Sequence, residues 1–357
     1  MGDDATQSSL ASRCPPVSVV VPTRNRGDRV TAAVRSLLEA DDREFRVIVV
    51  DQSDDRATSE ALRPYRTASN LLYVRSATRG SATARNIGIE ATQSEIIGLL
   101  DDDCEAGVGW VRRLLEAFEV DARIGIVFGN VEPGPHDSKA GFVPAYLRRE
   151  PYLAKTIREK HLVEGMSACM GIRRSAWQAL AGFDTLLGVG APLESGAEGD
   201  IAMRALQAGY FVYETPSLAL VHNGFRGWDD GRLLIRRYWY GTGAVFAKHL
   251  KTRARDTGPL LLRLAWRWAF SRSPVALSLG ANPHRMLRLA AFVRGFAAGA
   301  VTRVDPVTGQ YAPSGKESRW TGTRSWRHTT MRTPESTSEP TFSTDTTGRN
   351  RSLKSGY

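Results

Sequence analysis

The sequence predicts an α/β fold: an open, mostly parallel β-sheet with helices on both faces, followed by a helical, basic C-terminal region. Short apolar runs such as Val17–Val21 are expected for strands buried on both faces. Segments with apolar residues at helical spacing separate these runs, which implies parallel strands joined by crossovers. Polar loops follow several of the runs directly, and α/β proteins bind ligands at such strand ends.

The first half of the chain alternates between the two patterns. A helix is expected to begin at Asp28, because this residue can cap the apolar positions that follow it at helical spacing. The expected strands are 17–21, 45–50, 71–74, 96–100 and 124–128, and the expected helices are 28–38, 81–91 and 110–120.

The alternation weakens after residue 130. A polar stretch rich in Pro and Gly, 132–160, is expected to be a long loop or lid. Glycine is a good helix C-cap, so Gly209 should end a helix that starts at Asp200. The remaining expectations are a strand over 167–172, a helix over 175–180, a glycine-rich loop over 188–199, and strands over 210–213 and 218–222.

The chain becomes basic and helical after Gly224. These helices either pack on the domain or lie on an anionic membrane surface. The tail from residue 304 is rich in Ser, Thr and Arg, so disorder is expected there. The predicted organisation is a flexible N-terminus (1–15), an α/β domain (16–225) whose two halves are 16–130 and 131–225, a helical region (226–303) and a tail (304–357).

Composition narrows the functional classes. The 357 residues carry a formal net charge of +10, which favours polyanions such as nucleic acid, anionic lipid or phosphorylated substrates. The three cysteines are far apart and contain no CxxC pair, which argues against a disulfide framework or a zinc site. No signal peptide or apolar stretch of about 20 residues is evident, so a cytoplasmic protein is expected, with peripheral attachment to the inner face of the cell membrane as an option.

The strongest local signal is Asp101-Asp102-Asp103. Three adjacent carboxylates at the end of an apolar strand repel one another, and Mg²⁺ or Mn²⁺ would neutralise them and clamp a diphosphate. The alternative is a solvated acidic turn. Because an apolar strand leads directly into all three residues, a cation site is the favoured interpretation.

Other polar residues are expected at the same edge of the sheet. Asp51 ends a second strand, where it either contacts a ligand or forms an Asx-turn. The loop that begins with Pro22, Thr23 and Arg24 opens at this edge as well. Arg85 lies on the helix before the aspartates, where it could reach a phosphate or remain an ordinary surface arginine.

Glu198 and Asp200 lie near the predicted start of a helix. A carboxylate in such a loop can act as a general base, and the helix N-terminus favours its ionised form. Helix capping is the competing explanation, and Asp200 suits it well.

Taken in order, these motifs resemble the family 2 glycosyltransferases, which have the GT-A fold. The nucleotide-binding half is similar in Val-Val-Val-Pro-Thr-Arg-Asn-Arg (19–26), Val-Val-Asp (49–51), Ala-Arg-Asn-Ile-Gly (84–88) and Leu-Asp-Asp-Asp (100–103). The acceptor half is similar from Gly188 through Glu198-Gly-Asp200 to Val221-His222. The resemblance spans about residues 17 to 250.

The resemblance implies roles for single residues. Asp51 would contact the nucleobase, and Pro22 to Arg24 would surround the nucleoside. Asp101 and Asp103 match the Asp-x-Asp motif at the ribose and the metal. His222 matches a histidine near the metal in some relatives; the alternative is an ordinary strand-end histidine. The family's acceptor motif is Glu-Asp-x-Asp; here Ala197 replaces the first acid, Glu198 takes the base position and Asp200 matches the last acid.

The implied activity is inverting transfer of a sugar from a nucleoside-diphosphate sugar to a hydroxyl acceptor, which could be lipid-linked, with Mn²⁺ or Mg²⁺ as cofactor. No nucleic-acid partner is expected. Two alternatives remain. A nucleotidyltransferase could share this sheet but would typically have a more glycine-rich first loop. A catalytically degenerate relative that binds membranes or polyanions would explain the loss of the acid at residue 197.

Overall fold

The computed structural model describes residues 15–40, 44–252, 257–270 and 285–313. Contacts divide the chain into two units, Met1–Gly322 and Thr323–Tyr357, and all described residues belong to the first. The predicted flexible N-terminus, up to residue 14, and most of the predicted tail therefore lie outside the described residues. None of the helices among the described residues is long and apolar enough to cross a membrane.

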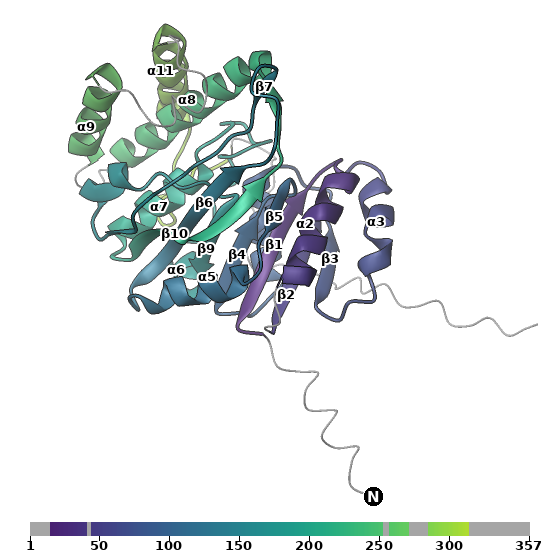
Figure 1. The fold of residues 1–357 in the computed structure, drawn as a ribbon. Coiled ribbons are helices and arrows are strands. Elements are labelled where there is room, and N and C mark those ends of the chain that lie inside the picture. Colours follow the sequence, from purple (N-terminus) through teal and green to yellow (C-terminus); the bar gives the residue numbers. More distant parts are fainter. Residues whose placement is uncertain (1–14, 41–43, 253–256, 271–284, 314–357) are drawn as a thin grey trace, which may run out of the picture. The chain divides into compact units, whose positions relative to one another are not determined.

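A mixed sheet of nine strands forms the centre of the fold (Figure 1). Its order is β3-β2-β1-β4-β9-β6-β10-β5, and β8 pairs with β10. The strands β3, β2, β1 and β4 are parallel to one another, whereas β9 is antiparallel to both its neighbours. The strand bounds are β1 Val17–Thr23, β2 Phe45–Asp51, β3 Leu71–Arg75, β4 Ile96–Leu100, β5 Cys104–Ala106, β6 Ile124–Pro133, β8 Tyr152–Ala154, β9 Cys169–Arg173 and β10 Phe211–His222.

Helices cover the sheet on both faces, as predicted. Side chains of a strand alternate between faces, so Val19 of β1 belongs to one core cluster and Val20 to the other. The cluster around Val19 includes residues of α2 (Gly27–Ala40) and α5 (Trp110–Glu119). The cluster around Val20 includes residues of α4 (Ser81–Glu90), α7 (Ala197–Gln207) and α8 (Trp228–Lys251). The smaller helices are α3 Ala57–Ala61, η2 Arg63–Tyr65, η3 Ile157–Leu162 and α6 Arg174–Ala179.

Glycines allow close packing of α4 against β1 and of α8 against a further C-terminal helix. Gly88 brings α4 against β1, because a Cβ at this position would collide with the side chain of Val20. In the C-terminal region, α8 crosses α11 (Arg285–Val301) at glycines on both helices. A Cβ on Gly243 or Gly295 would overlap the backbone of the opposite helix. The third C-terminal helix, α9, covers Thr257–Phe270.

The structure corrects three expectations. The predicted loop 132–160 contains β8, the start of η3 and the short strand β7 (Gly141–Phe142), which pairs with β11 (Arg226–Gly227). The two strands expected over 210–222 are one strand, β10, with register shifts in the middle. The start of the predicted tail is ordered: Tyr311 is buried, and its hydroxyl donates to the Ala244 carbonyl at 2.6 Å.

Candidate functional site

The parallel strands deliver polar residues to one edge of the sheet. Thr23 and Asp51 end β1 and β2 and stand opposite each other in the strand register. Asp101 directly follows β4, which is the other neighbour of β1. The carboxyl ends of three adjacent strands therefore meet, as predicted from the sequence.

Asp101 pairs with Arg85. A terminal guanidinium nitrogen of Arg85 donates to Asp101 Oδ1 at 2.7 Å. The Arg85 side chain is almost completely buried, and its Nε is among the few buried side-chain nitrogens of the described residues that have no hydrogen-bond partner. Asp101 retains about a third of its side-chain exposure. The pair therefore has a partly exposed carboxylate and, behind it, a buried N–H donor without a partner.

Asp102 joins the loop after β4 to the loop after β1. Thr23 Oγ1 donates to Asp102 Oδ2 at 2.8 Å, and Arg26 donates to Oδ1 at 2.9 Å. Burial raises the pKa of Asp102, although both partners act against this rise. With both carboxylate oxygens engaged inside the protein, Asp102 holds the two loops together.

Asp103 lies beside His222. The antiparallel pairing of β5 with β10 sets Cys104 opposite His222, and His222 Nε2 lies 3.2 Å from Asp103 Oδ1. The other ring nitrogen, Nδ1, lies 2.7 Å from the Pro144 carbonyl oxygen. A carbonyl oxygen can only accept, so Nδ1 carries the hydrogen. Nε2 of a neutral His222 would then turn a lone pair toward the carboxylate, an arrangement that requires a proton or a cation between the two atoms.

Three arginines surround the Asp103 carboxylate. Arg26 and Arg29 each approach Oδ2 to 3.4 Å, and Arg226 approaches it to 3.8 Å. Burial opposes ionisation of Asp103, but the hydrogen bond and charge of His222 and the nearby arginines outweigh it and lower the pKa of Asp103 to about 2. For His222, burial acts to lower the pKa, yet Asp103 reverses this effect and raises it.

The residues present fit a divalent cation. One ligand atom each of Asp103, Cys104 and His222 lies within 4.8 Å of the others, and all three residues are buried. Burial raises the pKa of the Cys104 thiol, so this group stays protonated and is a poor ligand for a hard cation. Asp103 and His222 are thus candidate ligands. Asp101, also predicted to bind metal, contacts Arg85 through one carboxylate oxygen.

The other residues predicted to bind the donor lie in the same loops but have internal partners. Asp51 is fully buried and accepts hydrogen bonds from the Tyr73 hydroxyl and the Ser53 amide. Arg24 pairs with Asp54 at 3.0 Å on the surface. Pro22 is the penultimate residue of β1 and is partly exposed.

The two predicted catalytic acids differ completely in their surroundings. Glu198 is partly exposed in the first turn of α7. Asp200 is fully buried and contacts Arg204 at 2.9 Å, Lys248 at 2.6 Å and His249 at 3.0 Å. Its oxygens are therefore committed to the interior, whereas Glu198 remains available to a ligand. Ala197, which takes the place of the family's first acid, is packed in the core.

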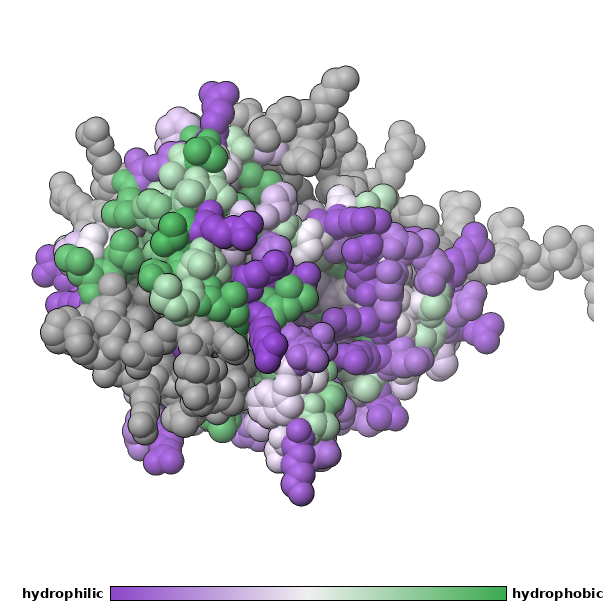
Figure 2. All heavy atoms as spheres, turned by 90° about the horizontal axis from the view of Figure 1, so that it is seen from above, coloured by the Kyte–Doolittle hydropathy of each residue, from purple (hydrophilic) through white to green (hydrophobic). Residues whose placement is uncertain are grey.

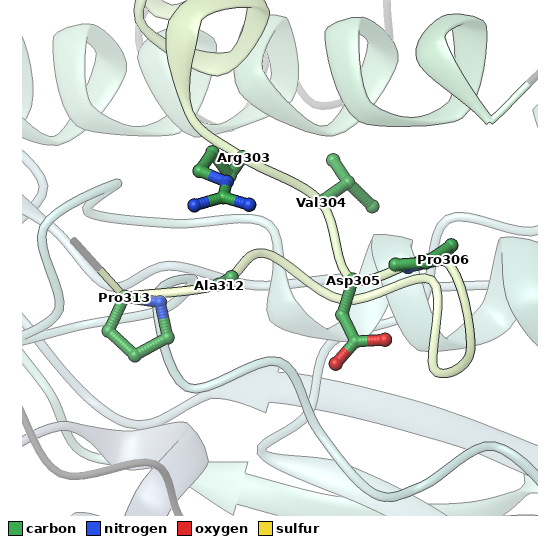
Figure 3. A pocket seen from close by; sticks show the side chains of 6 residues that line it. All are labelled: Arg303, Val304, Asp305, Pro306, Ala312 and Pro313. Carbon is green, nitrogen blue, oxygen red and sulfur yellow. The ribbon is translucent and has the colours of Figure 1, made fainter.

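Sequence reasoning missed the cations around Asp103. The positions of Arg26 and Arg29 could have revealed them, since both follow the end of β1 within one loop and the first turn of α2. Arg226 follows His222 by four residues, and the Asn223 amide donates to the Asp103 carbonyl oxygen at 2.7 Å, which brings this segment to the site. A small hollow lined by Arg303 to Pro306, Ala312 and Pro313 lies in the C-terminal segment and contains none of the site residues (Figure 3).

Sequence comparison identifies the domain. Residues 18–180 match the family described as glycosyl transferase family 2. Glycosyltransferase AglE of Haloferax volcanii is 30% identical over 127 residues, which cover 34% of this chain and 41% of that protein. The pre-mycofactocin glycosyltransferase of Mycobacterium tuberculosis is 26% identical over 295 residues, which cover 76% of this chain and 55% of that protein. The chain thus spans about half the length of these relatives.

Solved structures share the fold. Residues 1–349 of S. aureus TarS superpose with a TM-score of 0.53 at 17% identity, covering 78% of this chain and 80% of that one. The mannosyltransferase PcManGT of Pyrobaculum calidifontis, solved with GDP-Man and Mn²⁺, gives a TM-score of 0.52 at 18% identity, covering 82% and 88%. Residues 18–180 therefore form a domain similar to glycosyl transferase family 2, and the solved structures show that the chain shares their GT-A fold.

Proposed function

We propose that this chain is a metal-dependent, inverting glycosyltransferase that moves a sugar from a nucleoside-diphosphate sugar to a hydroxyl acceptor. The observation that supports this most directly is the contact between Asp103 and His222, 3.2 Å apart, beside the Arg85–Asp101 pair. A carboxylate and an imidazole form half of a cation site, and the adjacent guanidinium suits a phosphate.

Asp103 and His222 would hold the cation, and the carbonyl of Pro144 fixes the His222 ring so that Nε2 faces the ion. An imidazole ligand favours Mn²⁺ over Mg²⁺, which prefers an all-oxygen shell. When bound, the cation would stabilise negative charge on the departing nucleoside diphosphate. PcManGT, whose structure contains Mn²⁺ and GDP-Man, supports this proposal by analogy.

The donor would lie along the ends of β1, β2 and β4. Arg85 would bind a phosphate oxygen after a movement that exposes its buried Nε, which has no partner, and Asp101 has the exposure needed to accept from a ribose hydroxyl. Asp51 would recognise the base. The Tyr73 hydroxyl donates to one of its carboxylate oxygens, so this hydroxyl would move before that oxygen could accept from a base N–H. Pro22, Thr23 and Arg24 would line the nucleoside. TarS has been solved with UDP-GlcNAc and PcManGT with GDP-Man, so both bases belong in a donor screen.

Glu198 would be the general base. In one displacement the acceptor oxygen bonds to the anomeric carbon, the bond from that carbon to the phosphate oxygen breaks, and Glu198 takes the hydroxyl proton. The bonding pair leaves with the nucleoside diphosphate, and the configuration inverts. Asp200, two residues further on, would position this turn rather than touch the substrate, since all its contacts are internal.

The test is release of nucleoside diphosphate from a panel of nucleotide sugars and hydroxyl acceptors, with Mn²⁺, with Mg²⁺ and with chelator. We expect turnover that depends on the cation and is lost in Asp103→Asn. Donor binding in the presence of Mn²⁺ without turnover of any donor would favour a catalytically degenerate relative. The predicted nucleotidyltransferase activity is disfavoured by the family match. We also propose that the protein is cytoplasmic, attached to the inner face of the cell membrane, and that its acceptor is lipid-linked.

A further inference from the structure

The helix α11 has apolar residues on two opposite sides. One side packs on α8: Ala291 and Gly295 are buried there, and Phe292 contacts Phe246 with ring centroids 6.2 Å apart. A helix in water normally has a polar face opposite its buried one. The opposite side of α11 should therefore be polar if only solvent covers it.

The opposite side is apolar instead. Four large side chains on it have more than half of their surface exposed, Met286 at 76%, Leu289 at 57%, Val293 at 55% and Val301 at 83%. The exposed residues Ala290, Ala297 and Ala300 fill the same side. We call these seven residues the α11 stripe. Their spacing of three to four residues keeps them on one face over about 22 Å of helix, at about 1.5 Å per residue.

The charges around the α11 stripe have one sign. From Thr257 to Val304 the sequence contains seven arginines and no Asp, Glu or Lys. Among them, Arg263 on α9, Arg294 on α11 and Arg303 just after it are exposed. Leu262 on α9 is exposed as well. Viewed from above, apolar residues gather on the side of the molecule where α8, α9 and α11 lie, with isolated polar ones among them (Figure 2).

We propose that the α11 stripe and its flanking arginines form a docking surface for an anionic phospholipid membrane. Exposed aliphatic side chains beside cations are what an interfacial helix needs, because the aliphatic groups enter the headgroup boundary while the guanidiniums bind lipid phosphates. A second copy of this chain would bring the same arginines face to face across the contact. The one-sided charge therefore selects the lipid surface.

The test is co-sedimentation of the full chain with phosphatidylcholine vesicles, with or without phosphatidylglycerol. We expect binding to the anionic vesicles, weaker binding to the neutral ones, and partial loss in 1 M salt, since screening removes only the electrostatic part. Leu289→Ser/Val293→Ser should reduce partitioning at least tenfold. Arg294→Gln/Arg303→Gln should reduce it about 25-fold on anionic vesicles, at about fivefold for each arginine.

Matched controls lie on the nucleotide-binding half. Val120 is 56% exposed, nearly the same as Val293, so Val120→Ser should leave partitioning unchanged. Arg35→Gln/Arg63→Gln removes two exposed arginines elsewhere and should have a much smaller effect.

Three results would overturn the proposal. The first is wild-type protein that stays in the supernatant with every vesicle. The second is a dimer, found without lipid, that Leu289→Ser/Val293→Ser dissociates, because the stripe would then bind a second copy. The third is a much larger drop in melting temperature for that double variant than for Val120→Ser, because the chain itself would then cover the stripe. None of these readouts depends on glycosyl transfer.

Discussion

Lys248 is the residue whose loss should be most revealing. Lys248 belongs to α8 and its side chain is buried. Its ammonium lies 2.6 Å from an Asp184 oxygen and 2.6 Å from an Asp200 oxygen. Both aspartates are fully buried as well. One ammonium therefore contacts two carboxylates, and one of these belongs to the turn of α7 that carries Glu198. We predict that Lys248→Met both destabilises the fold and slows transfer.

The partners that remain determine the size of the effect. Asp200 would keep its contacts with Arg204 and His249. Burial lowers the pKa of His249, so its ring is neutral. The ring donates to Asp200 from Nε2, and Gln207 donates to Nδ1. Asp184 would keep only backbone N–H donors, those of Leu186 and Tyr311. Breaking a buried pair on one side typically costs about 3–5 kcal/mol. Because domains of this kind have a free energy of unfolding of about 5–15 kcal/mol, Lys248→Met should lose about a fifth or more of the stability.

Urea unfolding of the two proteins measures this directly, as a lower midpoint at an unchanged slope. Lys251→Met is the matched control, since this lysine lies one turn further along α8 and only hydrogen-bonds the exposed carbonyls of Ala300 and Thr302. The control should lose no more than about 1 kcal/mol. Asp184→Asn added to Lys248→Met should restore part of the loss. Equal unfolding midpoints for the two lysine variants would refute the reasoning.

Three further predictions address the site and the packing beneath it. His222→Ala should weaken Mn²⁺ binding at least tenfold by calorimetry. The control is His136→Ala, since His136 is exposed and follows β6, and its affinity for Mn²⁺ should not change. Equal affinities of the two variants would exclude His222 as a metal ligand. Glu198→Gln should lower the transfer rate 10²- to 10⁴-fold while the donor Kd changes less than about twofold, and full activity would exclude it as the base. Gly88→Ala should cost about 1–3 kcal/mol by overpacking, whereas Gly199→Ala, with open space around the new methyl, should not destabilise the fold.

The sequence predicts the first half of the fold well because local pattern and tertiary role agree there. Strands such as β1 are buried on both faces and read as continuous apolar runs, and the helices between them show one apolar stripe. The second half depends on pairings distant in sequence. Residues 141–142 become a strand only because residues 226–227 lie beside them, and Tyr311 is ordered because Ala244 and Asp184 receive its hydrogen bonds. No local pattern contains such information.

The candidate site follows the same division. Thr23, Asp51 and Asp101 could be assigned to one edge because parallel strands present their ends together. The contact of His222 with Asp103 depends on the register of β5 against β10, which no short-range signal reveals. Glu198 and Asp200 are two residues apart at a helix start, so sequence alone could not separate an accessible acid from a buried one. The burial of Asp200 comes from α8, about 50 residues later.

The three adjacent aspartates illustrate why a charged run need not act as one unit. Like charges at this spacing would repel, and a single cation was the predicted solution. The fold separates them instead: Asp101 pairs with Arg85 on α4, Asp102 with Thr23 and Arg26 after β1, and Asp103 with His222 on β10. Arg26 contacts both Asp102 and Asp103, but the three carboxylates otherwise have different partners, so the chain can form this edge before any cation binds. Asp103 is the one that lies beside an imidazole, so we propose the metal there and a structural role for Asp102.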